Sequence, residues 1–188
     1  MHFHEYSSLS GTHAILSASK YSWLNYDSEK MAATFRTAQA AALGTRLHEL
    51  AAEHIRLRIR MPRNNATFNR YVNDAIGYCM TPEQVLFYSM NAYGTADAIH
   101  FDDKKNFLRI HDLKTGSGRV KMDQLMIYQA FFCLEYHISP FDIESELRIY
   151  QNDDAMILNP EASDIRSIMD RVVEFDQLIE SLKEDSIG

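Results

Sequence analysis

The sequence predicts a mixed α/β (α+β) fold in which helices flank a small mixed β-sheet. Strand-like segments with alternating apolar residues lie between about residues 84 and 114, helical patterns precede them, and a further strand and two helical segments complete the pattern. Each element must bury an apolar face, so helices before and after the strands are expected to pack as layers on the sheet.

The N-terminal part of the chain is predicted to be helical. A short helix is expected over Ser17–Tyr26, a long one over Ser28–Met61, and a third over Thr67–Tyr78. Two apolar stripes on the long helix predict that it is largely buried. His48 lies on one stripe, one turn after Gly44, where a core histidine is the ordinary interpretation.

A hairpin is the central prediction. A strand over Gln84–Met90 should lead into two paired strands, Tyr93–Phe101 and Asn106–Lys114. A loop of even length keeps their apolar residues on one face and sets position 97 opposite 110. Asp97 then lies diagonal to Asp112, roughly 7 Å away at the backbone, where two carboxylates can share an ion. The alternative is an ordinary hairpin with a solvated, charged end.

The C-terminal part should close the sheet. Lys121–His137 is apolar almost all round, which predicts a deeply packed helix, and Gln124 and Tyr128 lie four residues apart on one of its faces. Polar ends on such a helix need partners, although Tyr128 could instead be a core ring with a surface hydroxyl. A strand over Glu144–Gln151 and a C-terminal helix over about residues 160–184 follow.

Composition limits the function classes. With 188 residues, 46% of them hydrophobic, the chain can bury one core, and a single domain over residues 1–188 is expected. A net charge of −7 argues against binding nucleic acid through bulk charge. No apolar segment has the length of a signal-peptide core or a membrane span, so a cytoplasmic protein without membrane contact is expected. The two cysteines, Cys79 and Cys133, are too few for an iron–sulfur cluster and are expected to be buried thiols.

Two basic clusters could meet phosphates despite the acidic total. One follows the hairpin and contains Lys114, Arg119 and Lys121, and the other contains Arg56, Arg58, Arg60, Arg63 and Arg70. For the arginine cluster a solvated helix surface is an equal alternative.

Asp97, Asp112 and Lys114 carry the chemistry that points to a function. Two carboxylates can hold a divalent cation beside a fixed ammonium group. Together these charges compensate the negative charge that develops when water attacks a phosphodiester. The combination predicts a metal-dependent nuclease.

The same residues resemble a known family. In order and spacing, several short motifs look like those of the RecB-type branch of the PD-(D/E)XK nucleases, which includes phage recombination exonucleases, and the resemblance covers about residues 17–151. The motifs are Leu16–Ser19, Gly44 with His48 and Glu49, Gly94 with Asp97, Asp112 through Gly116, and Gln124 with Tyr128.

The resemblance implies a restriction-endonuclease-like core and a metal site. His48, Asp97, Asp112 and the carbonyl of Leu113 would bind Mg²⁺ or Mn²⁺, and Lys114 would orient the attacking water. Gln124 and Tyr128 would steady the site, and Glu49 would assist through water. Independently of the resemblance, Arg119 and Lys121 flank the loop after Lys114 and are expected to contact DNA. Unlike many relatives, this chain lacks the cysteines for an iron–sulfur cluster.

The function expected from these observations is a Mg²⁺- or Mn²⁺-dependent deoxyribonuclease, an exonuclease in recombination, repair or DNA processing. An endonuclease and a catalytically silent nucleic-acid-binding or interaction module are the alternatives. The resemblance further implies a bacterial or phage-infected host cell, with a single-strand annealing or other recombination protein as a partner besides DNA. The sequence leaves the oligomeric state open.

Overall fold

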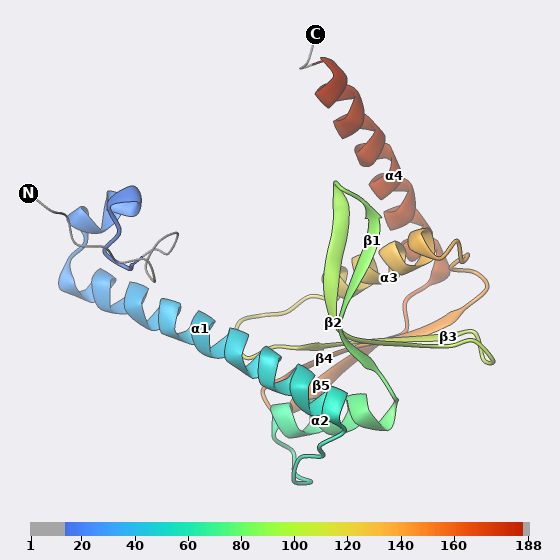
Figure 1. Ribbon diagram of the computed structural model, residues 1–188, viewed down its shortest axis with the longest axis horizontal. Coiled ribbons are helices and arrows are strands. Elements are labelled where there is room, and N and C mark those ends of the chain that lie inside the picture. The colour runs from blue at the N-terminus through green and yellow to red at the C-terminus, as the bar shows by residue number, and fades with distance from the viewer. Residues whose placement is uncertain (1–13, 186–188) are drawn as a thin grey trace, which may run out of the picture. The chain divides into compact units, whose positions relative to one another are not determined.

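The computed structural model describes residues 14–185, which contain a five-stranded mixed sheet with helices on both faces (Figure 1). The strands lie in sequence order: β1 (Thr81–Ser89), β2 (Ala92–Asp102), β3 (Phe107–Leu113), β4 (Glu144–Gln151) and β5 (Asp154–Leu158). β3 and β4 are parallel because helix α3 (Asp123–Glu135) carries the chain back between them, and the other neighbours are antiparallel. The predicted mixed α/β fold class is confirmed.

The chain divides into two compact units, one ending at Leu43 and one beginning at Gly44. The first unit contains the 3-10 helix η2 (Ala18–Asn25) in place of the short helix expected there. Trp23 Nε1 donates a hydrogen bond to the Ser17 carbonyl over 2.9 Å and ties this segment together. The second unit contains the sheet and the predicted site residues, and the single domain over residues 1–188 stays a prediction.

Helix α1 (Ser28–Leu57) belongs to both units and is less buried than expected. Its buried positions are small or medium residues, Gly44, Ala51, Ala52 and Ile55, whereas Leu50 and Leu57 are exposed. The prediction of a largely buried helix is therefore wrong, because only the stripe of small residues contacts the core. The helix ends before Met61 because Arg58 adopts a left-handed φ of 58° and its N–H bonds to the Ile55 carbonyl.

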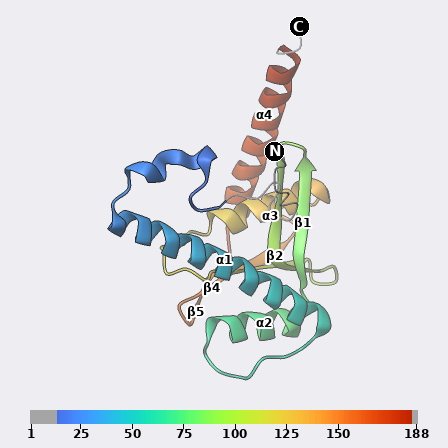
Figure 2. The same cartoon turned by 60° about the vertical axis from the view of Figure 1, so that its left-hand side comes forward.

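Helix α2 (Thr67–Gly77) covers one face of the sheet together with the C-terminal part of α1 (Figure 2). It coincides with the helix expected over Thr67–Tyr78. The shared core contains Ala51, Ile55, Tyr71, Val72, Ala75, Ile76, Ala98, Leu113 and Tyr150. Asp153 accepts the Thr67 N–H over 2.8 Å and so caps the helix from the β4–β5 turn.

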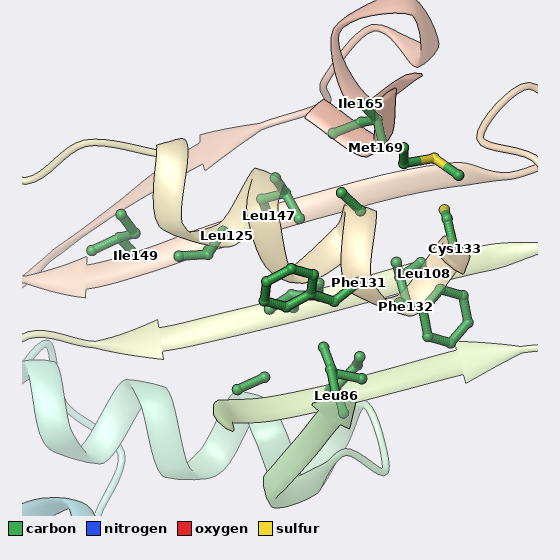
Figure 3. Close-up of a cluster of buried hydrophobic side chains, with 14 residues drawn as sticks. Leu86, Leu108, Leu125, Phe131, Phe132, Cys133, Leu147, Ile149, Ile165 and Met169 are labelled. Atoms are coloured by element: carbon green, nitrogen blue, oxygen red, sulfur yellow. The ribbon is translucent and has the colours of Figure 1, made fainter. Parts of the chain in front are cut away.

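Helices α3 and α4 (Ala162–Asp185) cover the other face (Figure 3). α3 is deeply packed, as predicted. The side chains that meet here come from both helices and from four strands, and include Leu86, Leu108, Leu125, Phe131, Phe132, Leu147, Ile149 and Ile165. Although α3 is apolar almost all round, no helix within residues 14–185 is long and apolar enough to cross a membrane.

Strand β5 is missing from the sequence prediction, although β4 has the predicted bounds. β4 and β5 form a hairpin in which Gln151 pairs with Asp154 around Asn152 and Asp153. Both turn residues have positive φ, 51° and 60°, as tight hairpin turns of the primed type require. The Asn152-Asp153 pair is the sequence feature from which this turn could have been predicted.

The two cysteines have different environments. Cys133 is buried on α3, and burial raises the pKa of its thiol to about 12. Cys79 is exposed, so the prediction of two buried thiols is wrong for this residue. Cys79 follows the end of α2 with a φ of 56°, where the chain turns out of the helix.

Leu147 provides a test of the core, because its side chain is fully buried in β4 against α3 and α4. Leu147→Ala should lower the free energy of unfolding by about 2–5 kcal/mol, since it removes buried apolar contacts and leaves a cavity. The matched control, Met156→Ala on β5, removes a side chain that is 49% exposed and should change stability much less. Urea unfolding of both variants measures the difference, and equal losses would contradict this packing.

Candidate functional site

The β1–β2 hairpin bends at two acidic residues, Glu83 and Asp97. Residues two apart in a strand normally share a face, yet Ala96 packs on the α3 side of the sheet and Ala98 on the α2 side. Glu83 lies opposite Asp97 and has a φ of 52°, in the left-handed region. Such backbone outside glycine costs about 1–3 kcal/mol and clusters at functional sites. The strain therefore falls on Glu83, next to Asp97.

The pairing of β2 with β3 brings Asp97 level with Asp112. Ile99 lies opposite Ile110 and Ala98 opposite His111, where the pairing ends, so Asp97 and Asp112 are the next residue on each strand. The even loop is confirmed, but the expected register, with 97 opposite 110 and the acids diagonal, is wrong by two residues. The turn starts one residue later than expected because the Asp102 carboxylate accepts the Lys104 N–H over 3.1 Å.

Asp97 connects the sheet with helix α1. Its Oδ2 atom accepts the Leu113 N–H over 2.9 Å, and His48 Nδ1 lies 3.3 Å from the same oxygen. The hydrogen bond to Asp97 raises the pKa of His48 above its ordinary value of 6.5, against burial, which lowers it. His48 thus faces the acid pair and is not an isolated core histidine.

Glu83 lies beside His48 and Asp97, and the sequence analysis did not predict it as a site residue. One ligand atom each from His48, Glu83 and Asp97 lie within 4.8 Å of one another, a spacing that fits a metal ion. Burial and the negative charge of Asp97 raise the pKa of Glu83 above 4.5. The expected strand began at Gln84, whereas β1 begins at Thr81. Pairing β1 back from its turn at residues 90 and 91 would have set Glu83 opposite Ala98, because the register shift between Phe87 and Ser89 is not visible in the sequence.

Asp112 is buried and paired with Lys114. The Lys114 ammonium donates to Asp112 Oδ1 over 3.1 Å and lies 3.0 Å from Oδ2. Oδ2 itself accepts no hydrogen bond with good geometry from any residue within 14–185. Burial and the charge of Asp97 raise the pKa of Asp112 above 3.8, and Lys114 opposes this. The buried carboxylate therefore keeps one oxygen that a cation could use.

Lys114 is held in place from helix α3. Its ammonium donates to Gln124 Oε1 over 3.0 Å, and Gln124 Nε2 donates to the Tyr128 hydroxyl over 3.0 Å. A Cβ atom on Gly94 would lie 2.8 Å from Tyr128 Cε1, so only glycine lets the ring approach β2 this closely. The polar ends predicted on α3 thus find their partners at the end of β3.

The loop after Lys114 places Arg119 and Lys121 beside it. Both line a pocket of about 460 Å³ together with Lys114, Gly116, Gly118, Val120, Gln124 and Gln151. Gln151 Nε2 donates to the Gly118 carbonyl over 2.8 Å and also to the Gly116 carbonyl, which fixes the loop on β4. The predicted DNA-binding residues Arg119 and Lys121 therefore lie beside the predicted catalytic residue Lys114.

Two further predicted residues, Leu113 and Glu49, lie near the site but have fewer contacts with the acids. The backbone of Leu113 is beside Asp97 through its N–H, and its side chain is buried on the α2 face. The role of its carbonyl as a metal ligand stays a prediction. Glu49 is an exposed residue of α1 whose negative charge acts on Glu83.

The donor set suits a hard divalent cation. His48, Glu83 and Asp97 offer one nitrogen and two carboxylate oxygens, and Asp112 adds the oxygen without a hydrogen bond. Oxygen donors with a single imidazole are compatible with Mg²⁺ and Mn²⁺. The residues therefore fit such an ion. No family model, curated protein or solved structure gave a significant match to this chain.

The raised pKa of Asp112 gives a pH-dependent prediction for the metal-free protein. The folded protein holds this proton to higher pH than the unfolded chain, so Asp112 destabilises the fold as the pH rises from 3.8 through its folded pKa. Asparagine does not titrate. In EDTA, the melting temperature of Asp112→Asn relative to wild type should therefore be higher at pH 7 than at pH 4.

Circular dichroism melts at several pH values measure this difference. Asp103→Asn, an exposed site in the β2–β3 turn, serves as the control and should show no such trend. A difference for Asp112→Asn that is independent of pH, or larger at pH 4, would contradict the electrostatic account.

Proposed function

We propose that this protein is a Mg²⁺- or Mn²⁺-dependent deoxyribonuclease with a restriction-endonuclease-like core of the RecB type, acting in the cytoplasm as an exonuclease. The observation that carries the proposal is the convergence of His48, Glu83 and Asp97 beside the buried pair of Asp112 and Lys114. A histidine, three carboxylates and one ammonium group suit phosphodiester hydrolysis, because the acids can hold a divalent cation and the ammonium adds positive charge where the phosphate becomes more negative.

Each residue has a role that follows from its contacts. His48, Glu83, Asp97 and Asp112 would hold the ion, which when bound supplies positive charge to the attacked phosphate. The Lys114 ammonium donates to Gln124 and is thereby positioned to orient the attacking water. Tyr128 fixes Gln124 and thereby the position of Lys114.

A cleavage assay distinguishes the proposed exonuclease from the two alternatives. End-labelled linear DNA and closed circular DNA, single- and double-stranded, are incubated with Mg²⁺, Mn²⁺ or EDTA. Loss of linear DNA alone supports an exonuclease, and nicking of circles identifies an endonuclease. Absence of cleavage in every metal condition, with DNA still bound, identifies a silent binding module and refutes the proposed reaction.

Two variants should separate metal binding from chemistry. Glu83→Gln removes a ligand charge and should weaken Mn²⁺ binding about tenfold or more. Lys114→Ala should leave Mn²⁺ binding close to wild type but lower kcat about 100-fold or more, because it removes the group that orients water. Glu53→Gln, an exposed acid on α1, is the matched control for the first. Isothermal titration and the cleavage assay measure both, and full activity in Lys114→Ala would refute the mechanism.

DNA binding should depend on the loop beside Lys114. Because the chain carries a net charge of −7, binding must rest on local cations. The double variant Arg119→Gln/Lys121→Gln should weaken DNA binding and reduce the slope of log K against log salt by about one to two units. Fluorescence anisotropy with Ca²⁺, which permits binding without cutting, measures this at several salt concentrations.

The control for this prediction is Lys104→Gln/Lys105→Gln, which removes the same charge from the exposed β2–β3 turn. It should leave the salt slope close to wild type. Equal effects of the two double variants would mean that the loop after Lys114 is not the DNA contact.

A further inference from the structure

We propose that a second basic pocket, on the α2 side of the second unit, binds a phosphate group. The pocket has a volume of about 460 Å³, which lies within the range of small-molecule sites. Its donors come from the segment after α1, from α2 and from the residue that follows α2, and are Arg60, Arg63, Asn64, Arg70, Asn73 and Tyr78. None of its lining residues lines the pocket beside Lys114.

The pocket concentrates positive charge in an acidic protein. Three arginines line it, and Asp74 is the only carboxylate in the lining among residues 14–185. That carboxylate is already engaged, because Asp74 Oδ2 accepts the Tyr150 hydroxyl over 2.7 Å and lies 3.6 Å from an Arg148 nitrogen. The arginines therefore face the pocket with little neutralising charge around it.

Arg60 and Arg63 have no ion pair with a carboxylate within residues 14–185, and both are exposed. Arg70 donates to the backbone carbonyl of Asp153 over 3.1 Å, so it too keeps guanidinium donors for a ligand. Planar guanidinium groups bind phosphate oxygens in pairs, and three around one pocket match a tetrahedral oxyanion.

The segment that carries Arg60 and Arg63 is held in place. Asn73 bonds both the N–H and the carbonyl of Met61, over 2.9 and 3.0 Å. Asn69 donates to the Pro62 carbonyl and to Asn64, over 3.2 and 3.0 Å. Because these hydrogen bonds fix the segment before a ligand arrives, they lower the entropic cost of binding. A solvated helix surface would not need them.

The pocket recognises phosphate and not a base. Among the residues that the structure describes, Tyr78 is the only aromatic ring in the lining, and the guanidinium groups of Arg109 and Arg148 lie 4.2 and 5.2 Å from the centre of that ring. The ring is thus occupied by cations and offers no stacking platform. A free nucleotide and the backbone of a nucleic acid share the phosphate chemistry that remains. The inference does not rest on the proposed nuclease activity.

The test is a titration in EDTA, where no metal can contribute, followed by ¹H–¹⁵N NMR. The probes are inorganic phosphate, dAMP and a short single-stranded oligodeoxynucleotide. In the wild-type protein, the backbone amides of Asn64, Asn73 and Gly77 should shift with saturation. Arg60→Gln/Arg63→Gln should weaken binding about tenfold or more, since two charge-assisted contacts are lost. Both sites are exposed, so the melting temperature should stay close to that of the wild type.

Two double variants with the same charge change serve as controls. Lys104→Gln/Lys105→Gln and Arg119→Gln/Lys121→Gln should each change the affinity for inorganic phosphate, measured from the amides of Asn64, Asn73 and Gly77, less than about twofold. The second separates this pocket from the proposed nuclease site, since DNA cleavage can fail while phosphate binding here persists. If dAMP binds this pocket more tightly per phosphate than the oligonucleotide does, the ligand is a free nucleotide. If the oligonucleotide binds more tightly per phosphate, the ligand is the backbone of a nucleic acid. Equal losses in all three variants, or amide shifts confined to the loop after Lys114, would overturn the proposal.

Discussion

The bend of the β1–β2 hairpin at Glu83 and Asp97 is the constraint on which the rest of the site depends. It turns one strand pair from the α2 face to the α3 face of the sheet, and it brings two carboxylates together at the turning point. The backbone pairing of β2 with β3 ends at Ala98 and His111, and just beyond it the Asp97 carboxylate accepts the Leu113 N–H, so a side-chain hydrogen bond connects the two strands there. Beyond it β3 continues alongside β4, with the Lys114 N–H bonded to the Tyr150 carbonyl.

Bringing three acids together in a metal-free fold requires compensation, and the structure supplies it from two sides. From α1, His48 gains a raised pKa and so carries positive charge near Asp97 more readily. From the end of β3, Lys114 neutralises Asp112, and Gln124 and Tyr128 hold the ammonium there. Burial, together with the negative charge of Asp97, keeps the pKa values of Glu83 and Asp112 raised, so this compensation is incomplete. A divalent cation would complete it, and this residual repulsion is what such an ion would relieve.

Most elements could be predicted from the sequence because apolar periodicity is a local property, and α2, α3, α4 and β4 lie close to their expected ranges. What could not be predicted depends on tertiary geometry. Glu83 lacked a signal because its role comes from a bend in the hairpin, and Asp97 and Asp112 were expected two residues out of register because the turn chemistry of Asp102 shifted the pairing. His48 could be assigned only by resemblance, since a histidine on a helix stripe is ordinarily a core residue.

Overall net charge is a poor guide to what this chain binds. Screening limits the reach of exposed charges to about 8 Å at physiological salt, so a phosphate near a pocket responds to the groups that line it. The loop after Lys114 is held by Gln151, and the arginine segment is held by Asn69 and Asn73. In both places side-chain amides fix a basic segment to its neighbour, which removes flexibility that would otherwise oppose binding. The acidic surface elsewhere then favours release of any polyanion not held at such a pocket, so contact with nucleic acid becomes local and selective for position.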